Sequence, residues 1–211
     1  MYISRYMIKE PVTVTPEMVL PEARRLLNEN HCRHLPVVDR DGQLVGMISD
    51  RDLRSAYPSS MLAESERLLV YARVEKAVVA DIMTTECITL TPESTLDDAL
   101  LLFDREGVGA LPVLEYGRVV GILSSRDLLA AYKVLFGVGE KGSVLLGIED
   151  EGHVGFMTKI VTLLEEHDIP FTRLLRIDDE ENGNRIYLRL NTYKIASVVN
   201  LLREAGIHPA L

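Results

Sequence analysis

Gly46-Met-Ile-Ser-Asp-Arg-Asp-Leu53 recurs, with a few changes, as Gly121-Ile-Leu-Ser-Ser-Arg-Asp-Leu128. The similarity extends outward, because residues 7–57 align with residues 83–132 at an offset of 76 positions. The offset becomes 75 after a one-residue gap near Asp41. About twenty of roughly fifty paired positions are identical, so the two segments are one structural unit used twice.

Each copy predicts the same order of elements, β-α-β-β-α, over about 55 residues. A Leu-Pro-Val strand is followed by a glycine turn and a second strand, and a Ser-x-x-Asp sequence then begins a helix. The expected strands are 12–14, 35–38 and 44–48 in the first copy, and 88–90, 111–114 and 119–123 in the second; the expected helices cover 20–27 and 96–103 and the regions after Ser49 and Ser124. One such unit has a marginal core, so the two copies are expected to fold packed together.

The Leu-Pro-Val strands and the Gly-x-Ile/Leu-Ser-x-Arg-Asp-Leu endings resemble those of paired CBS (cystathionine-β-synthase) domains, which form a Bateman module. The fold class is therefore expected to be mixed α and β. The expected boundaries are CBS domain 1 at 1–57, a helical linker at 58–77 with its helix around Met61–Val74, CBS domain 2 at 78–133, a glycine-rich linker at 134–142 and a third domain at 143–211.

The third domain predicts a ferredoxin-like βαββαβ order. Strands are expected at 143–149, 171–177, 185–190 and at the edge 207–211, with helices over 157–164 and 195–202 and a hairpin turn at 178–183. This pattern resembles the ACT domain, a small regulatory module, and the resemblance places a ligand loop at Asp150, Gly152 and Gly155. A CBS pair followed by an ACT-like domain resembles the arrangement of the AcuB family of acetoin-utilisation proteins. The G-x-G-x-x-G at 137–142 follows a helix and precedes a strand, the reverse of a dinucleotide loop, so a linker is expected there.

Composition excludes several classes of protein. The 211 residues are 47% hydrophobic and 26% charged, with a net charge of −9 and no basic arm, which disfavours binding to nucleic acid or an anionic membrane. No apolar run approaches the roughly 18–20 residues of a membrane span. Two cysteines cannot form a disulfide framework, so a reducing cytoplasm is expected.

The CBS resemblance implies an adenine-nucleotide site. In that family the aspartate of the Ser-x-x-Asp sequence, here Asp52 and Asp127, accepts hydrogen bonds from both ribose hydroxyls, and two carboxylate oxygens suit two vicinal donors. The other expected ligand contacts are Ser49 and Ser124 near ribose or phosphate, the basic residues Arg33, His34, Arg51 and Arg126, and the adenine-enclosing segments with Val12, Thr13, Pro36, Ile88, Thr89 and Pro112. AMP, ADP, ATP or S-adenosylmethionine would be a regulatory ligand. The same Ser-x-x-Asp sequence also fits a helix-capping box that needs no ligand.

No catalytic constellation and no metal site are expected. His31, Cys32 and His34 lie close in sequence, but the second copy has no matching ligands and a structural zinc site needs four. Cys87 has no neighbouring base. The sequence therefore favours a regulatory protein, homodimeric through the CBS pair and acting on a partner enzyme. A scaffolding dimer with degenerate sites and an amino-acid sensor acting through the third domain are the alternatives.

Overall fold

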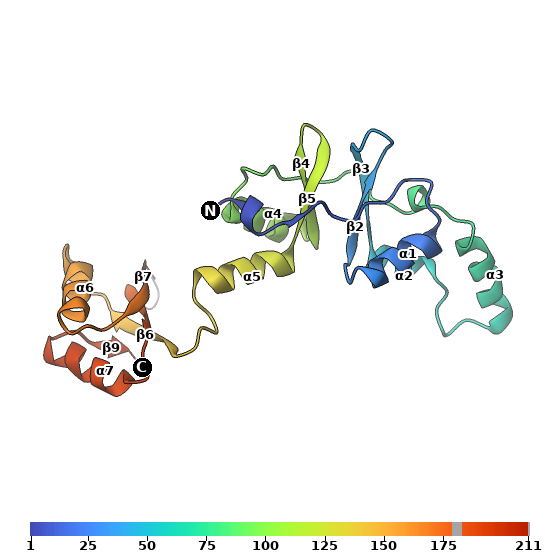
Figure 1. Cartoon of the computed structure of the whole chain (residues 1–211). Coiled ribbons are helices and arrows are strands. Elements are labelled where there is room, and N and C mark those ends of the chain that lie inside the picture. Colours follow the sequence, from blue (N-terminus) through green and yellow to red (C-terminus); the bar gives the residue numbers. More distant parts are fainter. Residues whose placement is uncertain (179–182, 211) are drawn as a thin grey trace. The chain divides into compact units, whose positions relative to one another are not determined.

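The chain folds into two compact units, residues 1–129 and residues 130–211 (Figure 1). The computed structural model describes residues 1–178 and 183–210. Helix α5 (Ser125–Leu135) is continuous across the boundary between them.

Both copies of the repeat have the predicted helix–strand–strand–helix order. The first copy consists of α1 (Leu20–Glu29), β2 (His34–Val38), β3 (Leu44–Ser49) and α2 (Asp50–Ala56), and the second of α4 (Leu96–Glu106), β4 (Ala110–Glu115), β5 (Arg118–Ser124) and α5. The two hairpins have equivalent registers, since His34 pairs with Ser49 and Ala110 pairs with Ser124. Figure 1 shows the hairpins side by side, and a hydrogen bond of 3.3 Å from the Leu44 amide to the Gly117 carbonyl joins them.

The first strand of each copy is much shorter than predicted. Instead of strands at 12–14 and 88–90, the structure has one parallel bridge in each copy, between Val14 and Val37 and between Leu90 and Val113. The Thr-Pro turn that follows directs the chain toward the helix, so only a single residue has its backbone groups in the ladder. Val14 is nevertheless buried and fixes its segment beside β2.

The N-terminal segments of the two copies are exchanged between them. Strand β1 (Ile8–Lys9), at the beginning of the first copy, pairs with β5 of the second. Thr84, which is the equivalent of Ile8 in the second copy, pairs with Met47 on β3 of the first copy. Two short 3-10 helices, η1 (Ile3–Arg5) and η2 (Val79–Asp81), precede these pairings and follow the same exchange.

Each exchanged segment buries an aliphatic side chain in the copy that it joins. The Val79 amide donates to the Met18 carbonyl at 2.8 Å, and Val79 is fully buried within the core of the first copy. In the same way the Ile3 amide donates to the Ser94 carbonyl of the second copy at 2.9 Å, and Ile3 is fully buried. Each copy therefore depends on a segment that lies outside its own repeat.

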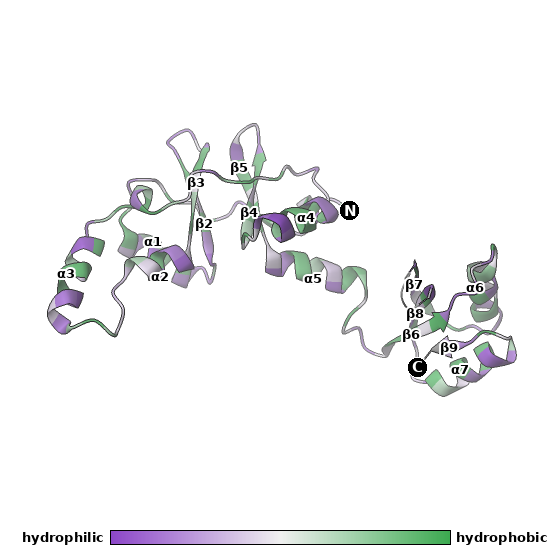
Figure 2. Ribbon diagram, turned by 180° about the vertical axis from the view of Figure 1, so that it is seen from behind, coloured by the Kyte–Doolittle hydropathy of each residue, from purple (hydrophilic) through white to green (hydrophobic). Residues whose placement is uncertain are grey.

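The predicted linker helix between the copies is confirmed as α3 (Glu64–Val74), which starts three residues later than expected. Its last residue, Val74, is buried in the core of the first copy, and the Tyr71 ring contacts Tyr57 edge-on. Leu68 and Leu69 remain exposed. Figure 2 shows hydrophobic and hydrophilic residues mixed along this helix.

The C-terminal unit confirms the predicted βαββαβ order. It consists of β6 (Ser143–Glu149), α6 (Phe156–Glu166), β7 (Phe171–Ile177), β8 (Arg185–Asn191), α7 (Ile195–Glu204) and β9 (Pro209–Ala210). Every pair in the sheet is antiparallel and the strand order is β7-β8-β6-β9, which is the ferredoxin-like topology. Residues 179–182 of the predicted hairpin turn and residue 211 of the predicted edge strand lie outside the described residues.

Alternation along β8 decides which face of this sheet the helices cover. Ile186, Leu188 and Leu190 are fully buried and pack with Ile160 and Leu202, from α6 and α7, in one core cluster. The opposite face of the sheet consequently presents the alternate residues of each strand.

Replacing Ile3 by alanine should destabilise the N-terminal unit by about 2–5 kcal/mol, because it empties a fully buried position that links the two copies. Urea unfolding followed by circular dichroism measures the loss. The control is Ile8→Ala in the same exchanged segment, where the side chain is 51% exposed and the change should cost far less. Equal effects of the two substitutions would contradict the role of the exchanged segment in the core.

Candidate functional site

Both Ser-x-x-Asp sequences form complete capping boxes. At the start of α2, the Ser49 amide and hydroxyl donate to Asp52 Oδ2 at 2.9 and 2.6 Å, and the Asp52 amide donates to Ser49 Oγ at 3.3 Å. At the start of α5, the corresponding distances between Ser124 and Asp127 are 3.0, 2.5 and 3.2 Å. The capping interpretation of the motif is therefore correct in both copies.

Capping uses only one oxygen of each aspartate. Every hydrogen bond that the described residues make to Asp52 and Asp127 ends on Oδ2, so both Oδ1 atoms keep their acceptor capacity. Both side chains are half-buried at the first turn of a helix, where the macrodipole favours negative charge. Each aspartate therefore caps its helix with Oδ2 and can still accept a hydrogen bond from a hydroxyl group at Oδ1.

Backbone hydrogen bonds bring the basic residues of the first copy to this helix start. The Asp50 amide donates to the Arg33 carbonyl at 2.9 Å, so Arg33 and His34 lie beside Ser49. In the second copy the Ser125 amide donates to the Gly109 carbonyl at 3.2 Å. The second copy thus has the same backbone arrangement without the two basic side chains.

His34 reaches across to the second copy. A methyl group added to Gly109 would lie 2.7 Å from His34 Nε2, so the imidazole is packed against the backbone where β4 of the second copy begins. Burial lowers the pKa of His34, and the nearby Asp52 carboxylate acts in the opposite direction. His34 is therefore held mainly neutral between the copies, within electrostatic range of the first capping box.

The remaining predicted contacts differ in exposure. Pro36 and Pro112 are buried, and their carbonyls accept from the Val14 and Leu90 amides at 3.0 Å. The neighbouring segments keep accessible side chains: Val12 and Thr89 are exposed, and Thr13 and Ile88 are half-buried.

Arg51 and Arg126 carry positive charge at the two helix starts. Both are exposed, and no ion pair within residues 1–178 and 183–210 involves either. Both charges therefore remain for an anion. The roles of all these residues toward a ligand stay predictions.

The predicted ligand loop of the C-terminal unit is tied to β7. The Arg176 guanidinium donates to both oxygens of Asp150, and the Gly152 amide donates to Oδ1 at 3.0 Å. The Arg176 hydrogen bonds hold the pKa of Asp150 below its usual range. Gly152 and Gly155 have φ values of +74° and +94°, which favour glycine. A ligand role for this loop stays a prediction.

Sequence reasoning missed Arg173. On the sheet face opposite the helices, its Nε donates to the Leu135 carbonyl and its Nη2 to the Val134 carbonyl, both at 2.8 Å, and Nη1 contacts Glu140 at 3.1 Å. The guanidinium thus caps the last carbonyls of α5, where the helix dipole favours a cation. Only the fold brings β7 to a helix end almost forty residues earlier, so no local pattern marks this residue.

Neither cysteine has the environment of a nucleophile. Burial raises the pKa of both Cys32 and Cys87, so both thiols stay protonated at neutral pH. Among the residues that the structure describes, no three His, Cys, Asp or Glu side chains are grouped so as to hold a metal ion. No described helix combines the length and apolar character needed to cross a membrane.

Comparison with protein families identifies the repeat. The family model of the CBS domain matches residues 3–59 and 79–134, more than half of the chain. The chain belongs to the CBS-domain family. Both matches contain a capping box, so the aspartates described above lie inside the two CBS domains.

Curated relatives show the same pair in different contexts. A CBS domain-containing protein of Dictyostelium discoideum is 39% identical over 129 residues, which cover 60% of this chain and 88% of the relative. An inosine-5′-monophosphate dehydrogenase of Bifidobacterium longum is 32% identical over 125 residues, which cover 58% of this chain but only 21% of that enzyme. The likeness to the enzyme therefore concerns about a fifth of its length.

Solved structures resemble the CBS pair. CBSX2 in complex with AMP is 26% identical, with a TM-score of 0.54 over 64% of this chain and 98% of the other. The CBS pair of protein MJ0100, in complex with 5′-methylthioadenosine and S-adenosyl-L-methionine, has the same identity, TM-score and coverage. A Vibrio cholerae protein assigned to acetoin utilization (AcuB) is 24% identical, with a TM-score of 0.55 over 66% of this chain and 96% of that one, and shares the fold. These three matches each cover about two thirds of this chain.

His34 should make the stability of the N-terminal unit depend on pH. Because burial lowers its pKa below the ordinary value of about 6.5, the unfolded state binds more protons, and stability should fall as pH drops through that value. We expect His34→Gln to lose less stability than the unchanged protein between about pH 7 and pH 5. Thermal unfolding across this range measures the difference, with His31→Asn as the control for an exposed histidine. Parallel pH profiles for His34→Gln and the unchanged protein would refute the assignment.

Proposed function

We propose that this protein is a non-catalytic sensor that binds an adenosine ligand between its two CBS domains and responds by a change in conformation. AMP, ADP, ATP and S-adenosylmethionine are the candidate ligands. The proposal is supported by the solved CBS pairs of similar fold that hold AMP or S-adenosyl-L-methionine with 5′-methylthioadenosine. In the proposal, Asp52 and Asp127 bind ribose.

The observation that carries the proposal is the free Oδ1 atom at each capping box. A ribose has two vicinal hydroxyl donors, and a carboxylate whose Oδ2 is fixed by the cap presents its other oxygen in a defined direction. The cap thus orients the acceptor before the ligand arrives, which reduces the entropy that binding must supply.

The charges around the caps suit a phosphate-bearing nucleotide at the first copy. Arg33, His34 and Arg51 lie near Asp52, whereas the second copy has Gly109 and Ala110 in place of the first two. We therefore propose that a phosphorylated nucleotide directs its phosphates toward the side of His34. An adenosine ligand without phosphate has less need of these residues.

Helix α5 is the proposed route from the ligand to the C-terminal unit. Asp127 caps its first turn, and Arg173 on β7 caps its last carbonyls. In the proposal, this helix of 11 residues transmits a displacement of its first turn to its last turn. A ligand that prefers one arrangement of the two CBS domains would thereby alter the position of the helix end that the C-terminal sheet holds.

We further propose a cytoplasmic homodimer formed through the CBS pair that regulates a partner enzyme, with acetoin utilisation as the pathway that the family resemblance implies. Leu101 and Leu129, on the helices of the second CBS domain, are 68% and 63% exposed. They support an apolar contact between two molecules of this protein. Light scattering of the purified protein measures the oligomeric state.

Asp127→Asn should weaken binding of the preferred adenosine ligand by about tenfold or more while the helix cap is retained. The asparagine oxygen still accepts from the Ser124 amide, but the amide group no longer offers a charged acceptor to ribose. Calorimetric titration with AMP, ADP, ATP and S-adenosylmethionine measures the loss, and Asp52→Asn tests the other site.

Thr95→Ala is the matched control, because it removes the capping hydroxyl of α4 in the same CBS domain, at about 1 kcal/mol of stability, and Thr95 is not a predicted ligand contact. Its effect on binding should be much smaller than that of Asp127→Asn. If no adenosine ligand binds even in the millimolar range while the dimer is intact, the sensor is excluded in favour of a scaffolding dimer with degenerate sites.

Arg173→Ala should uncouple the two units without changing nucleotide affinity. With Arg173 present, ligand binding should alter hydrogen exchange at both the end of α5 and β7; without it, the change should remain near the CBS domains. Hydrogen exchange with mass spectrometry measures both variants, with Arg203→Ala, on the exposed last turn of α7, as the control. An unaltered ligand response in β7 of Arg173→Ala would disprove this route.

A further inference from the structure

A cavity of about 820 Å³ lies in the C-terminal unit, where α6 ends and α7 begins. That size falls within the roughly 300–1,000 Å³ typical of small-molecule pockets. Its apolar lining comes from Ile169, Pro170, Val198 and Leu201. The cavity is not part of the CBS pair, and none of the residues proposed to contact a nucleotide lines it.

The cavity is also separate from the predicted ligand loop at 150–155. It adjoins Asn191, which pairs with Ser143 at the start of β6, whereas the loop follows Glu149 at the other end of that strand. Strand β6 has seven residues, so the two places lie about 20 Å apart along the sheet. This concave site is therefore distinct from both the CBS pair and the loop at 150–155.

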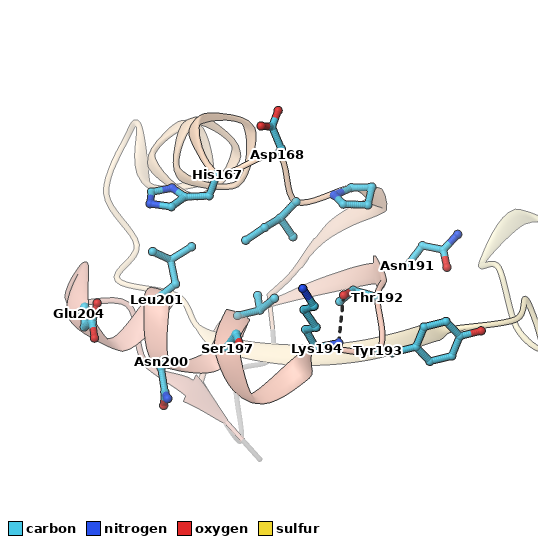
Figure 3. A pocket seen from close by; sticks show the side chains of 13 residues that line it. His167, Asp168, Asn191, Thr192, Tyr193, Lys194, Ser197, Asn200, Leu201 and Glu204 are labelled. Carbon is cyan, nitrogen blue, oxygen red and sulfur yellow. Dashed lines mark hydrogen bonds between the residues drawn. The ribbon is translucent and has the colours of Figure 1, made fainter.

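Val198 and Leu201 lie on one face of α7, and Lys194, the residue that immediately precedes the helix, lines the same cavity. Figure 3 shows the Lys194 and Leu201 side chains directed from α7 toward the segment that holds His167. Tyr193 and Asn200 point away from the space between these segments. The face therefore offers one ammonium group followed by an aliphatic surface.

His167 adds an imidazole ring to the lining of the cavity. Its Nδ1 lies 2.9 Å from the Leu163 carbonyl, an acceptor only, so Nδ1 donates and Nε2 is the atom left for another partner. Asp168, the next residue, points to the other side of the chain in Figure 3. Lys194 has no ion pair with any described residue.

From this arrangement we propose that the cavity binds a small aliphatic carboxylate, with its charged group at Lys194 and its hydrocarbon part along Val198 and Leu201. The site lacks the arginines that suit bidentate binding of phosphate, so a nucleotide is not the ligand. Buried aliphatic surface supplies affinity, and the single charge–charge contact fixes orientation.

An α-amino acid fits the charges less well than a simple carboxylate. Of the two carboxylates in the lining, Asp168 points away from the space in Figure 3. The other, Glu204, lies ten residues beyond Lys194 and thus about 15 Å away along the helix. The ammonium and carboxylate groups of an α-amino acid share one carbon, so they cannot contact both residues. The additional ammonium group would enter the site without a partner close to Lys194.

Titration of the full chain with 4-methylpentanoate, followed by ligand-observed NMR, tests the site. We expect saturable binding, which Lys194→Ala weakens by about tenfold or more because a charged hydrogen-bonding partner is lost. Ser197→Glu should weaken it as well: residue 197 is exposed in the first turn of α7, where an acidic residue suits the helix, but the new charge lies beside the bound carboxylate. Lys159→Ala, on α6 and outside the cavity lining, is the matched control.

Two analogues with the same carbon skeleton distinguish binding of a carboxylate from binding of a neutral amide or of an α-amino acid. The neutral 4-methylpentanamide and the amino acid leucine should both bind more weakly than 4-methylpentanoate. Equal binding of the amide, tighter binding of leucine, an unchanged affinity in Lys194→Ala, or no saturation in the millimolar range would each overturn the proposal. Asp127→Asn should leave carboxylate binding intact, so failure of the nucleotide site and failure of this site are distinguishable.

Discussion

Exchange of main-chain segments between the two CBS domains is the constraint on which the N-terminal unit depends. The Val79 amide, from before the second copy, pairs with Met18 of the first; the Ile3 amide, from before the first copy, pairs with Ser94 of the second. Each bond is accompanied by a fully buried aliphatic side chain. A buried amide without a partner costs about 1–3 kcal/mol, so neither copy is complete alone. The helix starts that hold Asp52 and Asp127 are positioned by the pair as a whole.

Much of this architecture could be predicted because it is periodic. The repeat fixed the helices and hairpins of both copies, and the alternation of Ile186, Leu188 and Leu190 located the buried face of the C-terminal sheet. The exchanged segments were not predicted, because β1 has only two residues and its partner lies more than a hundred positions away. The strands expected at 12–14 and 88–90 proved to be single bridges, because apolar alternation over three residues does not determine how many of them pair, and only Val14 and Leu90 are buried.

The candidate site shows the same division. The Ser-x-x-Asp sequence identified Asp52 and Asp127, but it could not say whether the carboxylates cap a helix or bind a ligand. The structure separates the two roles by atom, since the cap uses Oδ2 and leaves Oδ1. Arg173 has no sequence signature, because its contact with Val134 spans 39 residues and depends on how β7 is placed in the sheet. Spacing predicts contacts within an element, whereas contacts between elements require the fold.

Energetics indicate how a ligand would act on this arrangement. A capping box contributes about 1 kcal/mol, and both boxes are formed by the chain itself, so α2 and α5 do not require a ligand to fold. A ligand bound at micromolar affinity supplies about 8 kcal/mol, far more than the cap, but only its differential affinity for two arrangements shifts an equilibrium. That difference arises most readily where the copies are unlike. The His34 imidazole against Gly109 is such a place, because it is a half-buried, mainly neutral base on one copy facing bare backbone on the other. An anion placed there would favour the protonated imidazole, which has to be accommodated against the second copy. Proton uptake and a change in the contact between the two domains are then one event.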